Sequence, residues 1–155
     1  MIKYIFSLTI IFSASLCAAQ IQGHVIRVLD GDTLEILQDK KPVRVRLANI
    51  DAPEKKQPFG RWSATQLKDL VAGKPVTVQY AQTDRYGRIL GRVYTADGTE
   101  ANRWQVRNGA AWVYPDYNND YTLPPLQRDA RALKRGLWAD KNPVPPWTWR
   151  KQNKE

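Results

Sequence analysis

The sequence predicts an α+β domain, a five-stranded β-barrel of the OB-fold type with helices packed around it. Five short strand-like segments alternate apolar and polar residues or are rich in β-branched residues, and turn residues separate them. A helical segment lies between the third and fourth of these strands, which is the element order of an OB-fold. The length of 155 residues suits one compact domain and leaves little room for a second.

The first three predicted strands are close enough in sequence to form a meander. Residues 22–29 are rich in β-branched side chains and end at an Asp-Gly turn, and residues 33–38 follow directly. In residues 43–48, apolar side chains alternate with arginines. A period of two places Arg46 on the face opposite the apolar set.

One helix and two further strands complete the predicted barrel. Residues 59–71 have the spacing of a helix with one apolar stripe, and Gly73 is a suitable terminator. A fourth strand fits residues 75–81. A turn then leads to a fifth strand at residues 88–94.

The C-terminal part of the chain is predicted to be mostly helical. Thr99 can cap a short helix that ends at an Asn-Gly pair, and a second helix covers residues 126–135. Residues 141–155 combine several prolines with two tryptophans. We therefore expect one OB-fold domain at residues 20–140 and a tail that lies extended over it or frays.

Residues 1–19 have the pattern of a secretory signal peptide. Lys3 precedes an apolar run at residues 4–16, and small residues follow where a signal peptidase reads. The run is too short to span a bilayer comfortably. An uncleaved membrane anchor and a lipoprotein signal with a lipidated Cys17 are the alternatives. We expect cleavage after Ala19 and a secreted or periplasmic protein that has no membrane segment.

The composition narrows the possible chemistry. Lys+Arg number 24 against 15 Asp+Glu, a formal net charge of +9 that would attract polyanions. Many basic secreted proteins bind no nucleic acid, so charge alone leaves the partner open. Beyond the signal segment the chain has one histidine (His24), one serine (Ser63) and no cysteine. This composition disfavours a Ser-His-Asp triad and most zinc sites, so carboxylates and arginines must carry any catalysis.

Two acidic stretches lie at the ends of predicted strands. Asp30-Gly31-Asp32-Thr33 opens the second strand, and Asp51-Ala52-Pro53-Glu54 follows the third. Because the start of one antiparallel strand lies near the end of the next, the two stretches can converge. Converging carboxylates suit a hard cation such as Ca²⁺ or Mg²⁺. The alternative is that both stretches are merely turn formers, for which aspartate is a common choice.

A third stretch, Asp84-Arg85-Tyr86-Gly87-Arg88, predicts a tight turn before the fifth strand. Gly87 permits the turn, and Arg88 projects from the start of the strand. The simplest interpretation makes Arg88 and Arg46 solvated surface residues.

Taken together, these stretches resemble the motif series of the thermonuclease family, the staphylococcal or micrococcal nuclease-like proteins. No single motif is specific, but their order and spacing match, and the similarity covers roughly residues 23–140. It rests on Asp30-Gly31-Asp32-Thr33, Arg46-Leu47, Asp51-Ala52-Pro53-Glu54, Asp84-Arg85-Tyr86-Gly87-Arg88, Arg107-Asn108-Gly109 and Leu137-Trp138. The resemblance implies a staphylococcal nuclease-like OB-fold and a Ca²⁺-dependent nuclease. It also implies cleavage of the P–O5′ bond of DNA and RNA, which leaves 3′-phosphate ends.

The resemblance implies a metal-binding role for five residues. The side chains of Asp32 and Asp51 and the backbone carbonyl of Ala52 would coordinate Ca²⁺. Asp30 and Thr33 would orient the water molecules around the ion.

The resemblance also assigns the reaction and the substrate contacts. Glu54 would act as general base on the attacking water, and Arg46 and Arg88 would hold the scissile phosphate and stabilise the charge of the transition state. The nucleotide would be contacted by three further residues, Arg85, Tyr86 and Tyr114.

A non-catalytic OB-fold protein that binds nucleic acid is the main alternative, and a basic protein that adheres to anionic envelope polymers is another. The acidic residues argue against the first, since binding of a polyanion requires no acidic pocket. We expect a monomer with DNA and RNA as substrates and no stable protein partner.

Overall fold

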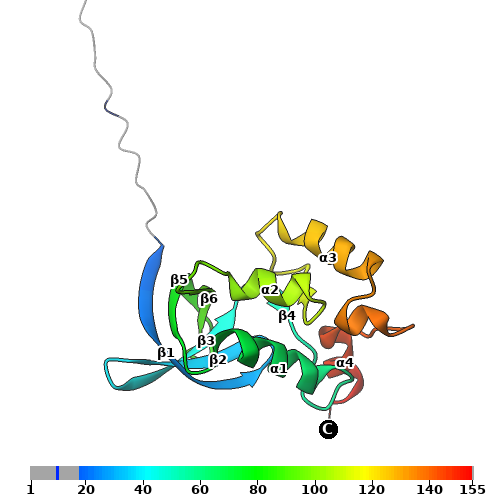
Figure 1. Ribbon diagram of the computed structural model, residues 1–155, viewed down its shortest axis with the longest axis horizontal. Coiled ribbons are helices and arrows are strands. Elements are labelled where there is room, and N and C mark those ends of the chain that lie inside the picture. Colours follow the sequence, from blue (N-terminus) through cyan, green and yellow to red (C-terminus); the bar gives the residue numbers. More distant parts are fainter. Residues whose placement is uncertain (1–9, 11–17, 155) are drawn as a thin grey trace, which may run out of the picture.

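The computed structural model describes residue 10 and residues 18–154 (Figure 1). Most of the predicted signal peptide, residues 1–19, lies outside the described residues. Among those that are described, no helix has the length and apolar character needed to cross a membrane.

Five strands form a closed barrel in the order β1-β2-β3-β6-β5. All neighbouring pairs are antiparallel except β3 and β6, which are parallel. This arrangement, with its covering helices, confirms the predicted α+β barrel of the OB-fold, staphylococcal nuclease-like class. The strands are β1 (Ala19–Asp30), β2 (Thr33–Gln38), β3 (Lys41–Leu47), β5 (Pro75–Thr83) and β6 (Ile89–Thr95).

β1 is longer than its β-branched run predicts, because it closes the barrel by pairing with two neighbours. Its first half pairs with β5, from Ala19 opposite Tyr80 to His24 opposite Pro75. Its second half pairs with β2 and contains two register irregularities. Such bulges bend a strand and increase its twist, which lets one strand serve both edges.

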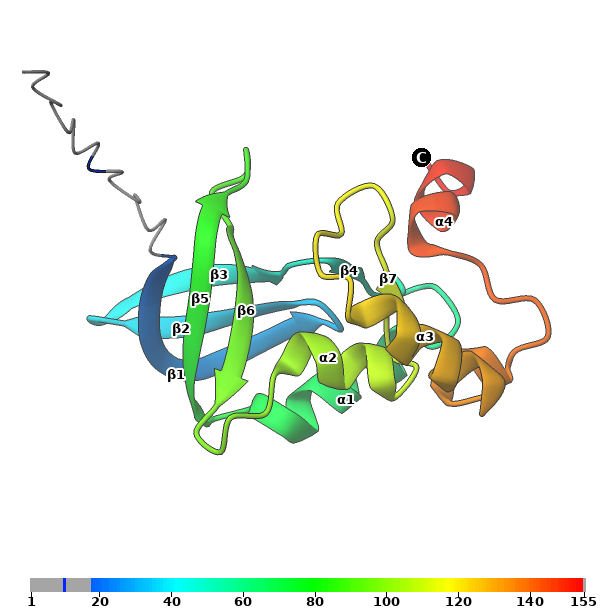
Figure 2. The ribbon, with the colours of Figure 1, turned by 90° about the horizontal axis from the view of Figure 1, so that it is seen from above.

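Two helices pack against one end of the barrel, α1 (Gly60–Val71) and α2 (Ala101–Arg107) (Figure 2). α1 buries the apolar stripe expected from its spacing, including Leu67 and Val71. α2 begins at Ala101 and not, as predicted, with a cap at Thr99. The backbone of Thr99 instead closes a turn, since its carbonyl oxygen accepts the N–H of Thr95 at 3.0 Å.

The C-terminal helices differ from the prediction. α3 covers Leu123–Ala132 and is followed by the 3₁₀ helix η1 (Gly136–Ala139), whereas residues 126–135 were predicted. Prolines in the first turn of a helix are tolerated, because the N–H they lack has no intrahelical partner there. The expectation that the tail lies extended or frays is wrong, because Pro146–Gln152 form a fourth helix, α4.

A two-stranded sheet, which the sequence did not predict, links the barrel to these helices. β4 (Ile50–Asp51) pairs with β7 (Trp112–Val113), and β7 packs against α3 (Figure 2). The main core fills the barrel and extends under α1. A second hydrophobic cluster, rich in tryptophan, holds the C-terminal segment and consists of Trp112, Ala130, Leu137 and Trp138, with Phe59 and Trp147 packed against it.

Candidate active site

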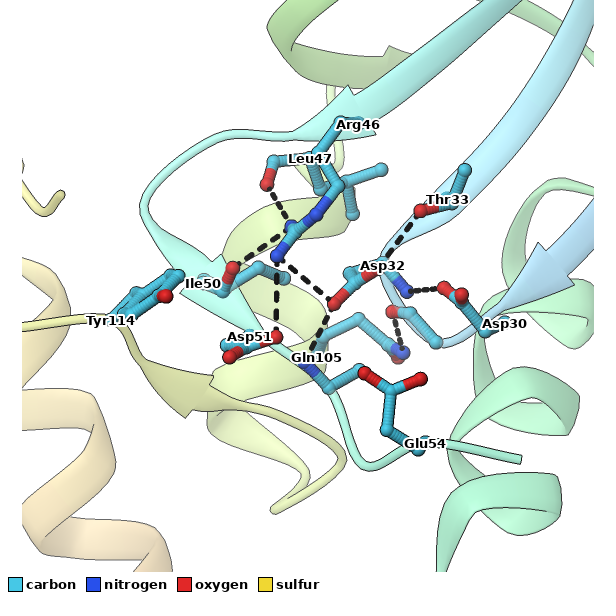
Figure 3. Close-up of polar contacts among 12 residues, drawn as sticks. Asp30, Asp32, Thr33, Arg46, Leu47, Ile50, Asp51, Glu54, Gln105 and Tyr114 are labelled. Atoms are coloured by element: carbon cyan, nitrogen blue, oxygen red, sulfur yellow. Dashed lines mark hydrogen bonds and ion pairs between the residues drawn. The ribbon is translucent and has the colours of Figure 1, made fainter. Parts of the chain in front are cut away.

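The two acidic stretches converge as their positions predict (Figure 3). Asp32 lies in the turn between β1 and β2, and Asp51 ends β4. The backbone N–H of Ala52 donates to Oδ2 of Asp32 at 2.7 Å, which ties the second loop to the first. Both aspartates are buried, with 5% and 2% of their surface exposed. Burial of a carboxylate costs free energy unless a cation or hydrogen-bond donors compensate its charge, so both aspartates need such partners.

The guanidinium of Arg46 joins the two carboxylates. Its Nη2 lies 3.2 Å from Oδ2 of Asp32 and 3.3 Å from Oδ1 of Asp51. Its Nη1 donates to the carbonyl oxygens of Leu47 at 2.7 Å and Ile50 at 2.9 Å. Arg46 does lie opposite the apolar face of β3, yet its side chain is only 13% exposed. It is therefore fixed in the site and is not a solvated strand residue.

Asp30 and Thr33 support Asp32 from either side. Thr33 donates its hydroxyl to Oδ1 of Asp32 at 2.9 Å, and Oδ1 of Asp30 accepts the backbone N–H of Asp32 at 3.0 Å. Burial alone would raise the pKa of Asp32, but Arg46 and these hydrogen bonds lower it below its ordinary value. Burial, and secondly the charge of Asp32, raise the pKa of Asp30. The pKa values of these two neighbouring carboxylates are therefore shifted in opposite directions.

Glu54 lies beside the pair on the loop that leads into α1 (Figure 3). Its backbone N–H donates to Oε1 of Gln57 at 3.1 Å, while its side chain is 40% exposed. Gly60, at the start of α1, has no room for a Cβ, because such an atom would meet the carbonyl of Glu54. The close approach of α1 to this loop therefore fixes the backbone from which the half-exposed side chain of Glu54 projects.

The fully buried Gln105 of α2 supports the site, although no sequence motif predicts this role. Its Nε2 donates to the carbonyl oxygens of Gly31 at 2.7 Å and Ser63 at 3.1 Å. Gly31 is packed so closely that a Cβ there would collide with the Ser63 side chain. Gln105 thus fixes the turn that presents Asp32. A glutamine at a core position of a helix is the only signal that could have pointed to it.

The predicted turn at residues 84–88 lies apart from this cluster. Oδ1 of Asp84 accepts the backbone N–H groups of Tyr86 and Arg88, each at 2.9 Å, and Oδ2 accepts Nε of Arg88 at 2.7 Å. Arg85 lies over the exposed ring of Tyr86, with 4.9 Å between guanidinium carbon and ring centroid. Within the described residues, the side chains of Arg85, Tyr86 and Arg88 make no contact with Arg46 or with the acidic pair. Arg88 nevertheless precedes β6, in which Leu90 lies opposite Arg46.

Tyr114 lies on the other side of the site, immediately after β7 (Figure 3). Its backbone N–H donates to the carbonyl of Asn49 at 2.9 Å. Its ring stacks on Trp147 of α4, with centroids 5.4 Å apart and 6° between the planes, and meets Tyr117 edge-on at 4.7 Å. An aromatic surface therefore borders the acidic pair.

Arg150 of α4 is the second residue that the sequence did not reveal. Its guanidinium contacts Asp51 and Glu54 directly, and Oδ2 of Asp51 lies 2.8 Å from its Nη2. Burial raises the pKa of Asp51, and the charge of Asp32 adds to this effect, while Arg150 and Arg46 oppose it.

The donor set fits a hard cation of the calcium or magnesium class. Asp32 and Asp51 are buried oxygen donors from separate loops, and one arginine nitrogen already bridges them. Burial, and secondly the charge of Asp32, raise the pKa of the neighbouring Asp30, so a cation close by would favour its charged form. In residues 10 and 18–154, no group of three or more His, Cys, Asp or Glu side chains gathers in a metal-binding arrangement, so backbone oxygen or water must supply the remaining ligands.

The fold and the site together indicate a protein that acts on phosphodiesters. A small barrel of the OB type carries buried carboxylates, an arginine fork and an aromatic rim at one end. These are the groups needed to bind and cleave an anionic phosphodiester.

Comparison with known proteins gives the family. A family model described as "Staphylococcal nuclease homologue" matches residues 44–140. The chain is 61% identical over 148 residues to an uncharacterized endonuclease of Escherichia coli, covering 96% of this chain and 97% of that protein. It is 40% identical over 146 residues to a micrococcal nuclease of Shigella flexneri, covering 88% of this chain and 84% of that protein. The chain therefore belongs to the staphylococcal nuclease family, and it is a nuclease.

Proposed function

We propose that this protein is a secreted or periplasmic, calcium-dependent nuclease that hydrolyses DNA and RNA at the P–O5′ bond and leaves 3′-phosphate ends. The observation that carries the proposal is the convergence of two buried carboxylates on the guanidinium of Arg46. Relatives that match nearly the whole chain are named endonuclease and micrococcal nuclease, which supports the same reaction class.

In this mechanism Asp32, Asp51 and the carbonyl of Ala52 would hold Ca²⁺, while Asp30 and Thr33 would orient the water around it. The ion would supply Lewis-acid polarisation of the phosphate and partial neutralisation of its charge. Thr33 already donates to Oδ1 of Asp32, and Ala52 donates to Oδ2. These donors set the orientation in which the carboxylate would meet the ion.

Glu54 takes a proton from the attacking water, and two arginines bind the phosphate oxygens. The exposed carboxylate of Glu54 can reach a water molecule that approaches from solvent. Arg46 is held by two backbone carbonyls, so it needs little reorganisation as charge develops on the phosphate. Arg88 joins it after leaving Asp84, since Arg88 directly precedes β6, which runs parallel to the strand of Arg46 and pairs with it.

The substrate strand is placed by residues on both sides of the site. Arg85 and Tyr86 are exposed on the turn beside Arg88 and contact a neighbouring phosphate. Tyr114 offers a ring on which a base can stack. Contacts with backbone and base faces discriminate little between DNA and RNA. The protein acts as a monomer after removal of residues 1–19.

A metal-dependence assay tests the proposal. Purified chain starting at Gln20 is incubated with single-stranded DNA and with RNA, in Ca²⁺, in Mg²⁺ and in EDTA. Degradation to 3′-phosphate products in Ca²⁺, stopped by EDTA, is expected. Cleavage that persists in EDTA would remove the metal from the mechanism, and tight binding without strand loss would favour the non-catalytic alternative. An Asp32→Asn/Asp51→Asn double variant is the control for contaminating nucleases.

A further inference from the structure

α4 covers the acidic site with a cation of its own. Nη2 of Arg150 lies 2.8 Å from Oδ2 of Asp51, and Nη1 lies 3.1 Å from Oδ1, so the guanidinium grips both oxygens of this carboxylate. Nη1 also donates to Oε1 of Glu54 at 2.9 Å. Charge-assisted, two-pronged contacts of this kind are the strongest that arginine makes with a carboxylate. One side chain therefore occupies both a proposed metal ligand and the proposed general base.

The same face of α4 covers the aromatic rim. Trp147 lies three residues before Arg150, so both project from one side of the helix. Its ring stacks on Tyr114 at 5.4 Å and meets Trp112 edge-on at 5.6 Å. Nη2 of Arg150 also lies 3.5 Å from the hydroxyl of Tyr114. The helix thus covers at once the groups that would meet the ion and the base.

The contacts that hold α4 are partly solvated. The helix has seven residues, of which Pro146 is buried and residues 147–150 are half-buried. The side chain of Arg150 is 39% exposed. The segment before the helix is tied by Nε2 of Gln57, which donates to the carbonyl of Val144 at 2.6 Å. Elements with so little buried surface open at low free-energy cost while the rest of the domain stays folded.

A metal ion and Arg150 compete for Asp51. The guanidinium of Arg150 already takes a lone pair on each carboxylate oxygen, and Arg46 takes another on Oδ1, so coordination of an ion is hindered while Arg150 is in place. We propose that α4 is a closing arm that seals the active site in the absence of metal, with Arg150 in the place of the cation and Trp147 on the base-stacking ring. Calcium and nucleic acid bind after the arm has left. The inference rests on the proposed calcium-dependent function and adds a regulation of that site.

The arm weakens calcium binding in proportion to the time it spends closed. When only a fraction of molecules is open, the observed Kd is the intrinsic value divided by that fraction. An arm that is closed nine-tenths of the time raises Kd about tenfold, which corresponds to about 1.4 kcal/mol. Variants that open the arm therefore bind Ca²⁺ more tightly than the unmodified chain, and this is measurable without any turnover.

Calorimetric titration of the metal-free protein with Ca²⁺ tests the arm. Arg150→Gln removes the contact, Arg150→Lys keeps the charge but loses the fork, and Trp147→Ala weakens docking with no change in charge. Lys151→Gln removes an exposed charge from the same helix and is the matched control. We expect Kd to fall about tenfold for Arg150→Gln, several-fold for Arg150→Lys and Trp147→Ala, and less than twofold for Lys151→Gln.

The possible results separate the arm from the proposed function. Equal Kd values for the unmodified chain and all four variants would overturn the arm and leave the calcium site intact. A fall in Kd for Arg150→Gln and Lys151→Gln alike, with Arg150→Lys unchanged, would reduce the effect to net charge and also overturn it. Absence of Ca²⁺ binding in every protein, matched by Asp51→Ala, would refute the calcium site and the arm with it.

Discussion

Gln105 is expected to be one of the most sensitive positions outside the reacting groups. Its amide donates two buried hydrogen bonds, to the carbonyls of Gly31 and Ser63. Each such bond contributes about 1 kcal/mol, and truncation to alanine adds about 1 kcal/mol for the space left in the core. Gln105→Ala should therefore lower the free energy of unfolding by about 3 kcal/mol. For a domain of this size that is a fall in Tm of about 10 °C.

Urea and thermal unfolding, followed by tryptophan fluorescence in metal-free buffer, measure this loss. Gln105→Met keeps most of the side-chain volume but cannot donate a hydrogen bond. It should therefore leave no cavity, and the loss of both hydrogen bonds should still lower the free energy of unfolding by about 2 kcal/mol. Gln79→Ala, at an exposed position of β5, is the matched control and should change the free energy by less than about 0.5 kcal/mol. A Gln105→Met variant as stable as the unmodified chain would refute the assigned role of these hydrogen bonds.

Three further predictions concern charge. Arg46→Lys should lower the rate of DNA cleavage about 100-fold or more, because lysine keeps the charge but not the paired donors of the guanidinium. The circular dichroism spectrum should stay unchanged. Near-normal activity would contradict the role of Arg46. Arg88→Ala should lower kcat by about 100-fold to 1000-fold and shift Tm by no more than a few degrees. A loss of activity that is explained entirely by a lower Tm would refute the proposed contact between Arg88 and the phosphate. Hydrogen bonds from Arg44 lower the pKa of Glu35 below 4.5, so Glu35→Gln should cost about 0.5 kcal/mol near pH 7. That difference should vanish as the pH falls below 4.5 and the carboxylate of the unmodified chain is protonated, and a constant difference in unfolding free energy would refute it.

The barrel was predictable because its strands carry their own local signal. Alternation in β3 placed Arg46 on the face opposite Val45 and Leu47, and the antiparallel meander brought Asp32 to Asp51. What the pattern could not give was the depth of burial of Arg46. Burial depends on β4 and its loop, a two-residue strand that pairs with a segment far away in sequence.

The C-terminal errors have a different physical origin. The proline-rich tail is predicted to be extended, yet Pro146 lies in the first turn of α4 and begins a helix. The prolines at residues 124 and 125 likewise lie in the first turn of α3, before the predicted start at residue 126. Helix α4 is too short to have a clear apolar period. It is held by Trp147, whose partners lie in β7 and just after β7, and by Arg150, whose partners lie in the loop around Asp51. Contacts of that range are set by tertiary packing, so no local pattern reveals them.

The net charge and the local charge of this protein have opposite signs, and the difference bears on how it works. A formal charge of +9 attracts nucleic acid from a distance, but a phosphate that arrives at the barrel end meets Asp30, Asp32, Asp51 and Glu54. Burial is the largest cause of the raised pKa values of Asp30 and Asp51, and the charge of Asp32 raises both further. A further cation beside these carboxylates would favour their charged forms and lessen the repulsion of an incoming phosphate. In the closed molecule that cation is Arg150, which neutralises the site but also blocks it. A small, dissociable ion can neutralise the site without blocking it. For this reason a divalent metal is expected to convert the closed site into one that accepts a phosphodiester.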